Sequence, residues 1–214
     1  MVSELTAYTE TEERIFEAAL HVFARKGKDG ARMQEIADAA GINKAMLHYY
    51  FRSKDKLYEA VFAFVFQHFI DTLGKAIRDA ETFEQTLRTF IDGYIDSVKD
   101  NLDVVRLMVN ENLSGAPVMG SRIKEAFHAT ELAPPRLFVE KLSAAIANGE
   151  IRSVDPKQTL LSVISCCLFF FITLPTVRIM NPEAQDLDTF IEQRKAHIFD
   201  LIYTGLKPRP DAAS

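Results

Sequence analysis

Apolar residues recur at helical spacing along nearly the whole chain, and this feature constrains the fold more than any other. Side chains on one face of a helix lie three or four residues apart, whereas those on one face of a strand alternate. The helical spacing extends from Thr9 to Leu206, without a run of sustained alternation. We therefore predict an all-α protein with about nine helices. The expected helical segments are residues 9–27, 33–40, 44–50, 54–80, 83–99, 102–112, 118–148, 157–176 and 183–206.

Several of these segments carry recognisable end signals. Thr9 and Glu12 match a capping box at the start of the first helix. Gly27 is suited to end that helix. Ser53 can cap the long segment 54–80. The pair of prolines at 134–135 should break or kink the segment 118–148, because proline lacks the N–H that a helix interior requires.

The most apolar stretch, residues 160–174, is shorter than the ~20 residues that a membrane-spanning helix needs, so we expect a buried or interface helix. Cys166 and Cys167 are adjacent and lack metal-ligand spacing, which indicates reduced, buried side chains rather than a disulfide or a metal site. The N-terminus lacks the apolar core of an export signal. We expect a cytoplasmic protein without cofactor or metal.

The charges are unevenly distributed. The chain of 214 residues has a net charge of −5. Between Arg25 and Lys56 lie eight basic and four acidic residues, whereas the rest of the chain has 17 basic and 26 acidic ones. A small basic region on an acidic protein is typical of a chain that contacts phosphates with one end.

Residues 33–50 have the pattern of a helix-turn-helix. Two short segments are joined by Gly41-Ile42-Asn43, in which Gly41 can adopt the positive φ of a tight turn and Asn43 can cap the second helix. The residues expected to pack inward are Ile36, Ala37, Ala40, Leu47 and Phe51. The residues left on the outer face of the second helix, which would face a DNA major groove, are Lys44, Ala45, His48 and Tyr49.

In this region the sequence resembles the TetR family of bacterial transcriptional regulators (TetR/AcrR-like). The resemblance spans residues 14–62, about a quarter of the chain, with an Ile-Phe-x-Ala-Ala entry, a block from Ile36 to Gly41, and Leu47-x-Tyr-Tyr-Phe followed by Ser53-Lys54. It implies that Lys54 holds a backbone phosphate. The other DNA contacts that it implies are Asn43, Lys44, Ala45, His48, Tyr49 and Tyr50.

The chain departs from the family pattern at the start of the segment 33–40. Ala31 and Arg32 stand where the family usually has hydroxyl residues, so the side-chain cap of this helix is missing. We include Arg32 and Met33 among the DNA-contact residues and leave open whether Arg32 replaces the cap with a phosphate contact. His48 stands where tyrosine is commoner, which leaves its DNA partner open.

The resemblance implies a two-part protein. We expect a helix-turn-helix DNA-binding domain over residues 1–53, a helical ligand-binding and dimerisation domain over 54–206, and a flexible tail over 207–214. The implied function is a ligand-responsive regulator, which we interpret as a repressor. It would bind a pseudo-palindromic operator as a homodimer and be released by a small, mostly apolar effector.

Two further sets of residues are expected in the second domain. The last two apolar segments are the best candidates for dimerisation, since four such helices can form one interface. The residues assigned to the dimer interface are Leu160, Leu161, Ile164, Leu168, Phe190, Ile191, Ile198, Leu201 and Ile202. The residues suggested for an effector pocket, against the simpler interpretation that they form ordinary core, are Phe62, Phe66, His68, Phe69, Arg106, Asn110, Glu111, His128, Phe138 and Phe169.

Two other classes of function are weighed against a regulator. An enzyme is disfavoured, because the sequence has no nucleophile elbow, phosphate-binding glycine loop, HExxH or CxxC motif. A small-molecule or protein-binding helical dimer without DNA binding stays open, and the missing hydroxyl cap at residues 31–32 is the feature that favours it.

Overall fold

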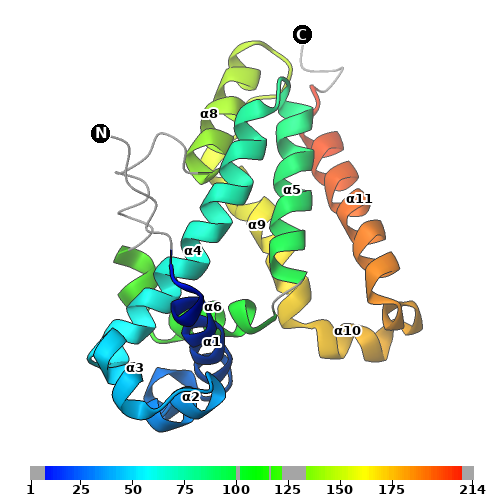
Figure 1. Cartoon of the computed structure of the whole chain (residues 1–214). Coiled ribbons are helices and arrows are strands. Elements are labelled where there is room, and N and C mark those ends of the chain that lie inside the picture. The colour runs from blue at the N-terminus through cyan, green and yellow to red at the C-terminus, as the bar shows by residue number, and fades with distance from the viewer. Residues whose placement is uncertain (1–7, 100–101, 116, 122–133, 209–214) are drawn as a thin grey trace, which may run out of the picture. The chain divides into compact units, whose positions relative to one another are not determined.

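The computed structural model describes residues 8–99, 102–115, 117–121 and 134–208, without the side chains of residues 66–72 and 183. Over these residues the chain is almost entirely helical and forms no β-strand (Figure 1). The predicted all-α fold is confirmed, and more helices form than the nine expected, because proline and capping residues divide the C-terminal segments.

The chain forms two compact units. Unit 1 comprises Met1–Gln67 and Asp103–Arg122, and unit 2 comprises His68–Leu102 and Ile123–Ser214. The chain therefore passes between the units three times: inside α4 (Lys54–Asp79), at the start of α6 (Leu102–Leu113), and after residue 122. These bounds differ from the expected division at residue 53, because α6 packs with the N-terminal helices. Of the tail expected over 207–214, residues 209–214 lie outside the described residues.

Unit 1 begins with α1 (Glu10–Gly30), α2 (Met33–Ala39) and α3 (Lys44–Phe51). The predicted capping box forms: the Thr9 hydroxyl accepts a hydrogen bond from the Glu12 amide, and the Glu12 carboxylate accepts one from the Thr9 amide. Helix α1 is interrupted at Gly27, whose φ of 68° lies in the left-handed region. The predicted end of the first helix corresponds to this break.

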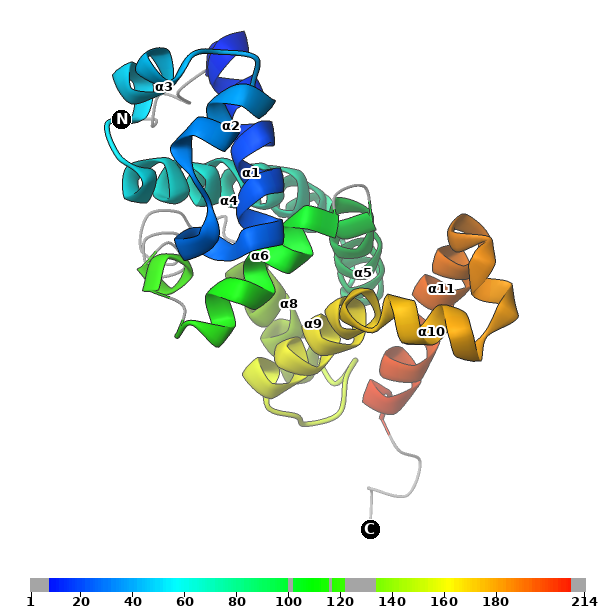
Figure 2. The ribbon, with the colours of Figure 1, turned by 90° about the horizontal axis from the view of Figure 1, so that it is seen from below.

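The core of unit 1 lies between α1, α2 and α3, which Figure 2 shows together. Helix α6 lies beside α1, to which Asp103 and Asn110 are bonded. Helix α1 buries an apolar face, and each large side chain removed from water contributes about 1.5–3 kcal/mol. Small Ala37, which is fully buried, allows α2 to approach its neighbours closely. The fully buried residues at the centre of this core are Ile15, Phe16, Phe23, Ile36, Ala37 and Leu47.

Unit 2 is built around α5 (Phe83–Lys99), which packs against α8 (Pro134–Ala147), α9 (Pro156–Ile172) and α11 (Leu187–Leu206). Helix α5 begins with a second reciprocal cap, in which Thr82 and Gln85 bond to each other's amides. Phe138 of α8 is fully buried against the rings of Phe83 and Phe90. Helix α8 is described from Pro134 onward, and the residues immediately before the predicted break at 134–135 lie outside the described residues.

The helix expected over residues 157–176 is divided into α9 and α10 (Leu174–Met180), which are bent by 73°. Pro175 explains the break, since inside a continuous helix its ring would clash with the preceding turn. A 3-10 turn (Pro182–Gln185) and the cap residue Asp186 then separate α10 from α11. Among the described helices none is by itself long and apolar enough to cross a membrane, and α9 and α10 meet that test only as this bent pair.

Candidate nucleic-acid interface

The turn between α2 and α3 has the predicted geometry. Gly41 has a φ of 67°, and the Ile42 amide donates to the Ala37 carbonyl at 3.0 Å. The guanidinium of Arg14 on α1 donates to the Ala40 carbonyl at 2.7 Å and so holds the end of α2. Sequence analysis assigned Arg14 no such role, because 26 residues separate it from its partner.

Helix α3 presents one face to its own unit and the other to solvent. Asn43 caps it, accepting a hydrogen bond from the Met46 amide at 2.7 Å, and Leu47 is fully buried beneath it. The side chains on the opposite face are exposed, and Tyr49 is 78% exposed. Tyr50 is half-buried and stacks against Phe51. The exposed residues on the outer face of α3 are Lys44, Ala45, His48 and Tyr49, as predicted.

An open groove of about 470 Å³ lies between the start of α2 and the outer face of α3. It brings together five of the nine residues predicted to contact DNA, from the start of α2, from α3 and from the start of the long helix α4. Three of the five carry cationic groups, so the groove has the charge that a phosphate backbone requires. The lining residues, which we call the reading groove, are Ala31, Arg32, Met33, Gln34, Lys44, His48 and Lys54.

Lys54, at the first position of α4, has a second role that sequence analysis missed. Its ammonium donates to the carbonyl oxygens of Asp29 and Ala31 at 3.0 and 3.2 Å. An ammonium has three N–H donors, so two hold the linker between α1 and α2 while the third can reach a phosphate. The Ser53 hydroxyl caps α4 as predicted, by accepting from the Lys56 amide at 3.2 Å.

His48 is held in one orientation. Its Nδ1 lies 3.3 Å from the carbonyl oxygen of Arg52, a residue with a φ of 42°. A carbonyl only accepts, so in the neutral ring Nδ1 carries the proton and Nε2 is an acceptor. Such an acceptor suits the amino group of adenine or cytosine in the major groove, whereas Lys44 is a donor suited to guanine.

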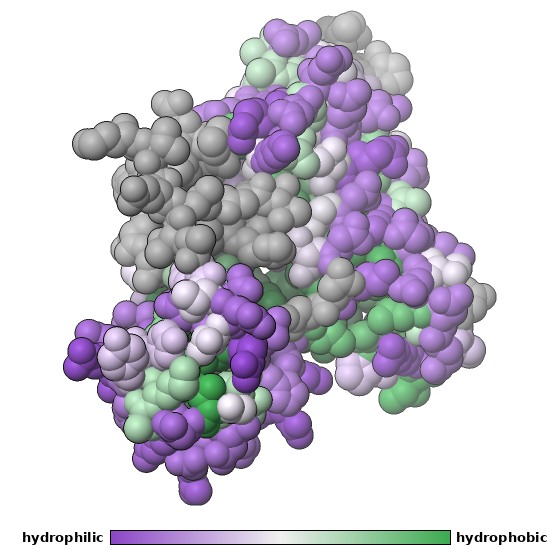
Figure 3. Space-filling model, viewed as in Figure 1, coloured by the Kyte–Doolittle hydropathy of each residue, from purple (hydrophilic) through white to green (hydrophobic). Residues whose placement is uncertain are grey.

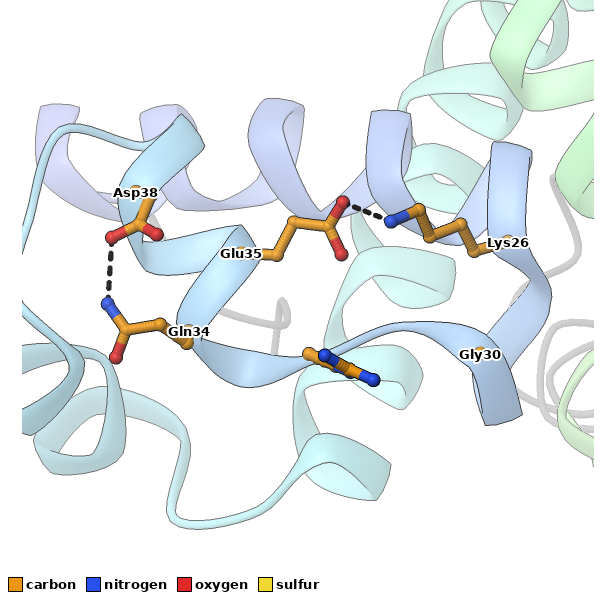
Figure 4. A pocket seen from close by; sticks show the side chains of 6 residues that line it. Lys26, Gly30, Gln34, Glu35 and Asp38 are labelled. Carbon is orange, nitrogen blue, oxygen red and sulfur yellow. Dashed lines mark hydrogen bonds and ion pairs between the residues drawn. The ribbon is translucent and has the colours of Figure 1, made fainter.

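Arg32 is the N-cap residue of α2 and, among the described residues, makes no side-chain cap bond. It also lines a second hollow, of about 520 Å³, together with Lys26, Gly30, Gln34, Glu35 and Asp38 (Figure 4). There the Lys26 ammonium lies 2.5 Å from the Glu35 carboxylate, and the Gln34 amide donates to Asp38 at 2.7 Å. Its two carboxylates make this hollow less suited to a phosphate than the reading groove.

Comparison with known proteins assigns both parts of the chain. Residues 15–61 match the family described as "Bacterial regulatory proteins, tetR family", and residues 84–202 match "Tetracyclin repressor-like, C-terminal domain". The chain belongs to the tetR family of bacterial regulatory proteins. It is therefore a helix-turn-helix transcriptional regulator, which agrees with the geometry of the reading groove.

Individual tetR-family relatives match over most of their length. The transcriptional regulator RutR of Escherichia coli is 26% identical over 207 residues, covering 95% of this chain and 93% of RutR. The transcriptional repressor NicS of Pseudomonas putida is 28% identical over 162 residues, or 75% of each chain. The crystal structure of AibR with isovaleryl coenzyme A and operator DNA has a TM-score of 0.69 at 20% identity, covering 91% of this chain and 98% of AibR, and has the same fold.

Of the ten residues suggested for an effector pocket, six have described side chains, and these six are divided between the two units. In unit 1, Phe62 is buried against the ring of Tyr58, and the Asn110 amide donates to the Ala24 carbonyl at 3.3 Å. Glu111 is also buried in unit 1, and Arg106 is exposed and pairs with Asp103. In unit 2, Phe138 belongs to the aromatic core, while Phe169 is 63% exposed on α9. His128 and the side chains of Phe66, His68 and Phe69 lie outside the described residues.

The residues assigned to the dimer interface divide into two groups. Leu160, Ile191 and Ile198 are buried within the single chain and are not available to a partner, because α11 packs one face against α5. Leu161 and Leu201 are 58% and 60% exposed. The half-buried members of the set are Ile164, Leu168, Phe190 and Ile202.

Additional exposed apolar side chains that were not predicted lie at the end of α9 and on α10, in unit 2. Ile172, at the end of α9, is exposed, as are Ile179 and Met180 on α10. Apolar residues are visible over α10 in Figure 3. Exposed apolar residues can mark an interaction surface, so we add these three to the candidate interface residues.

Proposed function

We propose that this tetR-family chain is a ligand-responsive repressor that binds a pseudo-palindromic operator as a homodimer. A small, mostly apolar effector binds the C-terminal part, favours a geometry in which the two α3 helices no longer fit successive major grooves, and so releases the DNA. The protein acts in the cytoplasm, on nucleoid DNA, as a regulator rather than as an enzyme.

The reading groove is the observation that carries the proposal. It places Arg32 and Lys54, which suit phosphates, beside Lys44 and His48, which suit base edges. Phosphate contacts fix the position of a protein on DNA, and contacts to base edges give sequence preference. One surface therefore has both groups of contacts that operator recognition needs.

Homodimerisation is supported by the exposed apolar residues on α9 and α11, Leu161, Phe169 and Leu201. Pairing these helices with their symmetry mates would remove this surface from water and fix the distance between the two α3 helices. Effector binding is supported by the match of residues 84–202 to the C-terminal domain of the family, and by AibR, a protein of the same fold that holds both isovaleryl coenzyme A and operator DNA. Repression is supported by the similarity to NicS, which is a repressor.

A helical dimer without DNA binding is the second candidate, because α2 begins at Arg32 without a side-chain cap. Fluorescence anisotropy distinguishes the repressor from the dimer without DNA binding. The protein is titrated with DNA from upstream of its own gene at two salt concentrations. The regulator should bind one segment at least 10³-fold more tightly than unrelated DNA. Equal affinity for all sequences, abolished by moderate salt, would contradict the proposal. The Lys44→Ala variant, which keeps α3 capped, is the control for binding through the reading groove.

A further inference from the structure

Glu111 is a buried carboxylate at which three separate stretches of unit 1 meet. Its side chain is 2% exposed. One carboxylate oxygen accepts a hydrogen bond from the Tyr58 hydroxyl at 2.9 Å. The other accepts from the backbone amides of Val118 and Met119, at 2.6 and 3.1 Å. Because a buried charge is unfavourable unless it is hydrogen-bonded, these three donors are required by the carboxylate and are held by it.

These three stretches are the ones by which the chain leaves unit 1. Tyr58 lies on α4, which continues into unit 2 after Gln67. Glu111 lies on α6, which begins where the chain returns from unit 2. Val118 and Met119 begin a helical stretch that precedes the third passage, after residue 122. The three stretches of unit 1 from which these connections run are therefore joined at one side chain.

Two of these stretches, those of Tyr58 and of Glu111, also contact α1, on which the helix-turn-helix packs. The ring of Tyr58 meets that of Phe23 edge to face, with ring centroids 4.9 Å apart. The Asn110 amide, one residue before Glu111, donates to the Ala24 carbonyl of α1. Helix α1 in turn packs against α2, so the position of the helix-turn-helix follows that of the stretches that Glu111 joins.

We propose that Glu111 is a positioning residue for operator binding. Through its bonds to Tyr58, Val118 and Met119, it holds the three stretches of unit 1 that lead to unit 2 in one arrangement. Glu111 contacts no DNA itself, because it is buried inside unit 1. The inference rests on the proposed binding of a full operator by a dimer. It adds the residue that fixes the orientation of the DNA-binding head, the helices α1 to α3, in each subunit of the dimer.

A positioning role has a consequence that a purely structural role lacks. When one head of a dimer has bound its half-site, the second head binds intramolecularly, with an effective concentration that depends on geometry. Loosening the three connections broadens the orientations of the second head and lowers that effective concentration. Affinity for a full operator then falls, whereas affinity for an isolated half-site does not.

The test compares Tyr58→Phe and Glu111→Gln with the wild-type full-length dimer. Tyr58→Phe removes only the hydroxyl and keeps the ring against Phe23. Glu111→Gln keeps the shape and one acceptor oxygen but places an amide where the second acceptor stood. Tyr203→Phe is the matched control, because it removes a tyrosine hydroxyl of unit 2 that interacts with another glutamate, Glu84.

Dissociation constants are measured by fluorescence anisotropy on the full pseudo-palindrome and on a single half-site, with thermal unfolding recorded for each variant. We expect Tyr58→Phe and Glu111→Gln to weaken binding to the full operator about fivefold or more, with half-site affinity within about twofold of wild type. The control should match wild type on both DNAs. Equal losses on both DNAs would indicate a damaged head and overturn the positioning role, as would unchanged affinity for the full operator in both variants. Failure of the wild-type dimer to bind any upstream DNA would instead overturn the proposed function itself.

Discussion

The ammonium of Lys54 lies 3.2 Å from the carbonyl oxygen of Ala31, one of the two residues that link α1 to α2. Lys54 also bonds to the carbonyl oxygen of Asp29, so the first residue of α4 holds the end of α1 and the linker in which Arg32 lies. Arg32 lines the reading groove. One side chain thus both shapes the groove and has a remaining donor for a phosphate.

Replacing Lys54 with Met should therefore have two effects. Operator binding should weaken about equally for all DNA sequences, and the slope of log affinity against log salt should fall by about one, since a phosphate contact carries no sequence information. The linker carbonyls lose their donor, which should cost about 1–3 kcal/mol of unfolding free energy. Salt-dependent anisotropy and urea unfolding measure the two effects, with Lys75→Met, an exposed lysine of unit 2, as control. A Lys54→Met variant with unchanged operator affinity and unchanged unfolding free energy would show that Lys54 has no part in the groove.

Replacing Lys44 or Tyr49 with Ala should change which operator is preferred. Both side chains are exposed on the outer face of α3, where base edges are read. The loss should be about 1–3 kcal/mol for the preferred base pair and smaller for its substitutes. Affinities for a set of singly substituted operators measure it, and Lys56→Ala, outside the groove, is the control. A uniform loss across the set would place these residues on the DNA backbone instead.

Two substitutions on α11 should act differently, because their side chains lie in different surroundings. Leu201 is 60% exposed and Ile198 is 1% exposed. Leu201→Asp should give a folded monomer with weakened operator binding, whereas Ile198→Asp should unfold unit 2 by burying an unpaired charge. Sedimentation velocity and circular dichroism distinguish the outcomes. A Leu201→Asp protein that remains dimeric would move the interface away from this face of α11.

The thiol of Cys167 should be unreactive in the folded protein. Burial, and next the adjacent Cys166, raises the pKa of Cys167 to about 12, so the thiol is protonated at pH 8. Iodoacetamide at pH 8 should label Cys167 only after unfolding, as measured by peptide mass spectrometry. Since only the unfolded chain releases this proton between the ordinary thiol pKa and about 12, the contribution of Cys167 to stability is present below that range and is lost as pH rises through it. Rapid labelling of the native protein would contradict its buried position.

Local signals in the sequence predicted the DNA-binding head well. The capping box at Thr9, the positive φ of Gly41 and the cap by Asn43 each depend on residues within a few positions of one another, and all three are found in the structure. The exposed face of α3 follows from the same local periodicity. Pro175 was an equally local signal, and extending a helix across it to residue 176 was wrong.

Contacts between distant residues could not be predicted in this way. The bond between Tyr58 and Glu111 joins residues 53 positions apart, and the bonds of Lys54 to the α1–α2 linker span more than 20. The apolar stripe of α11 had a different difficulty. Periodicity identifies an apolar face but not the surface that covers it, and α11 packs Ile191 and Ile198 against its own chain while Leu201 stays exposed.

The most direct test of the account is a hydroxyl-radical footprint of the full-length dimer on DNA from upstream of its own gene. Two α3 helices related by a two-fold axis should protect two half-sites of related sequence, with centres about 34–36 Å apart or a whole number of helical turns apart. Substituting Tyr49 should weaken the protection within both half-sites alike. A single protected half-site, or uniform weak protection along the fragment, would contradict the central claim that a dimer reads its operator with both copies of α3.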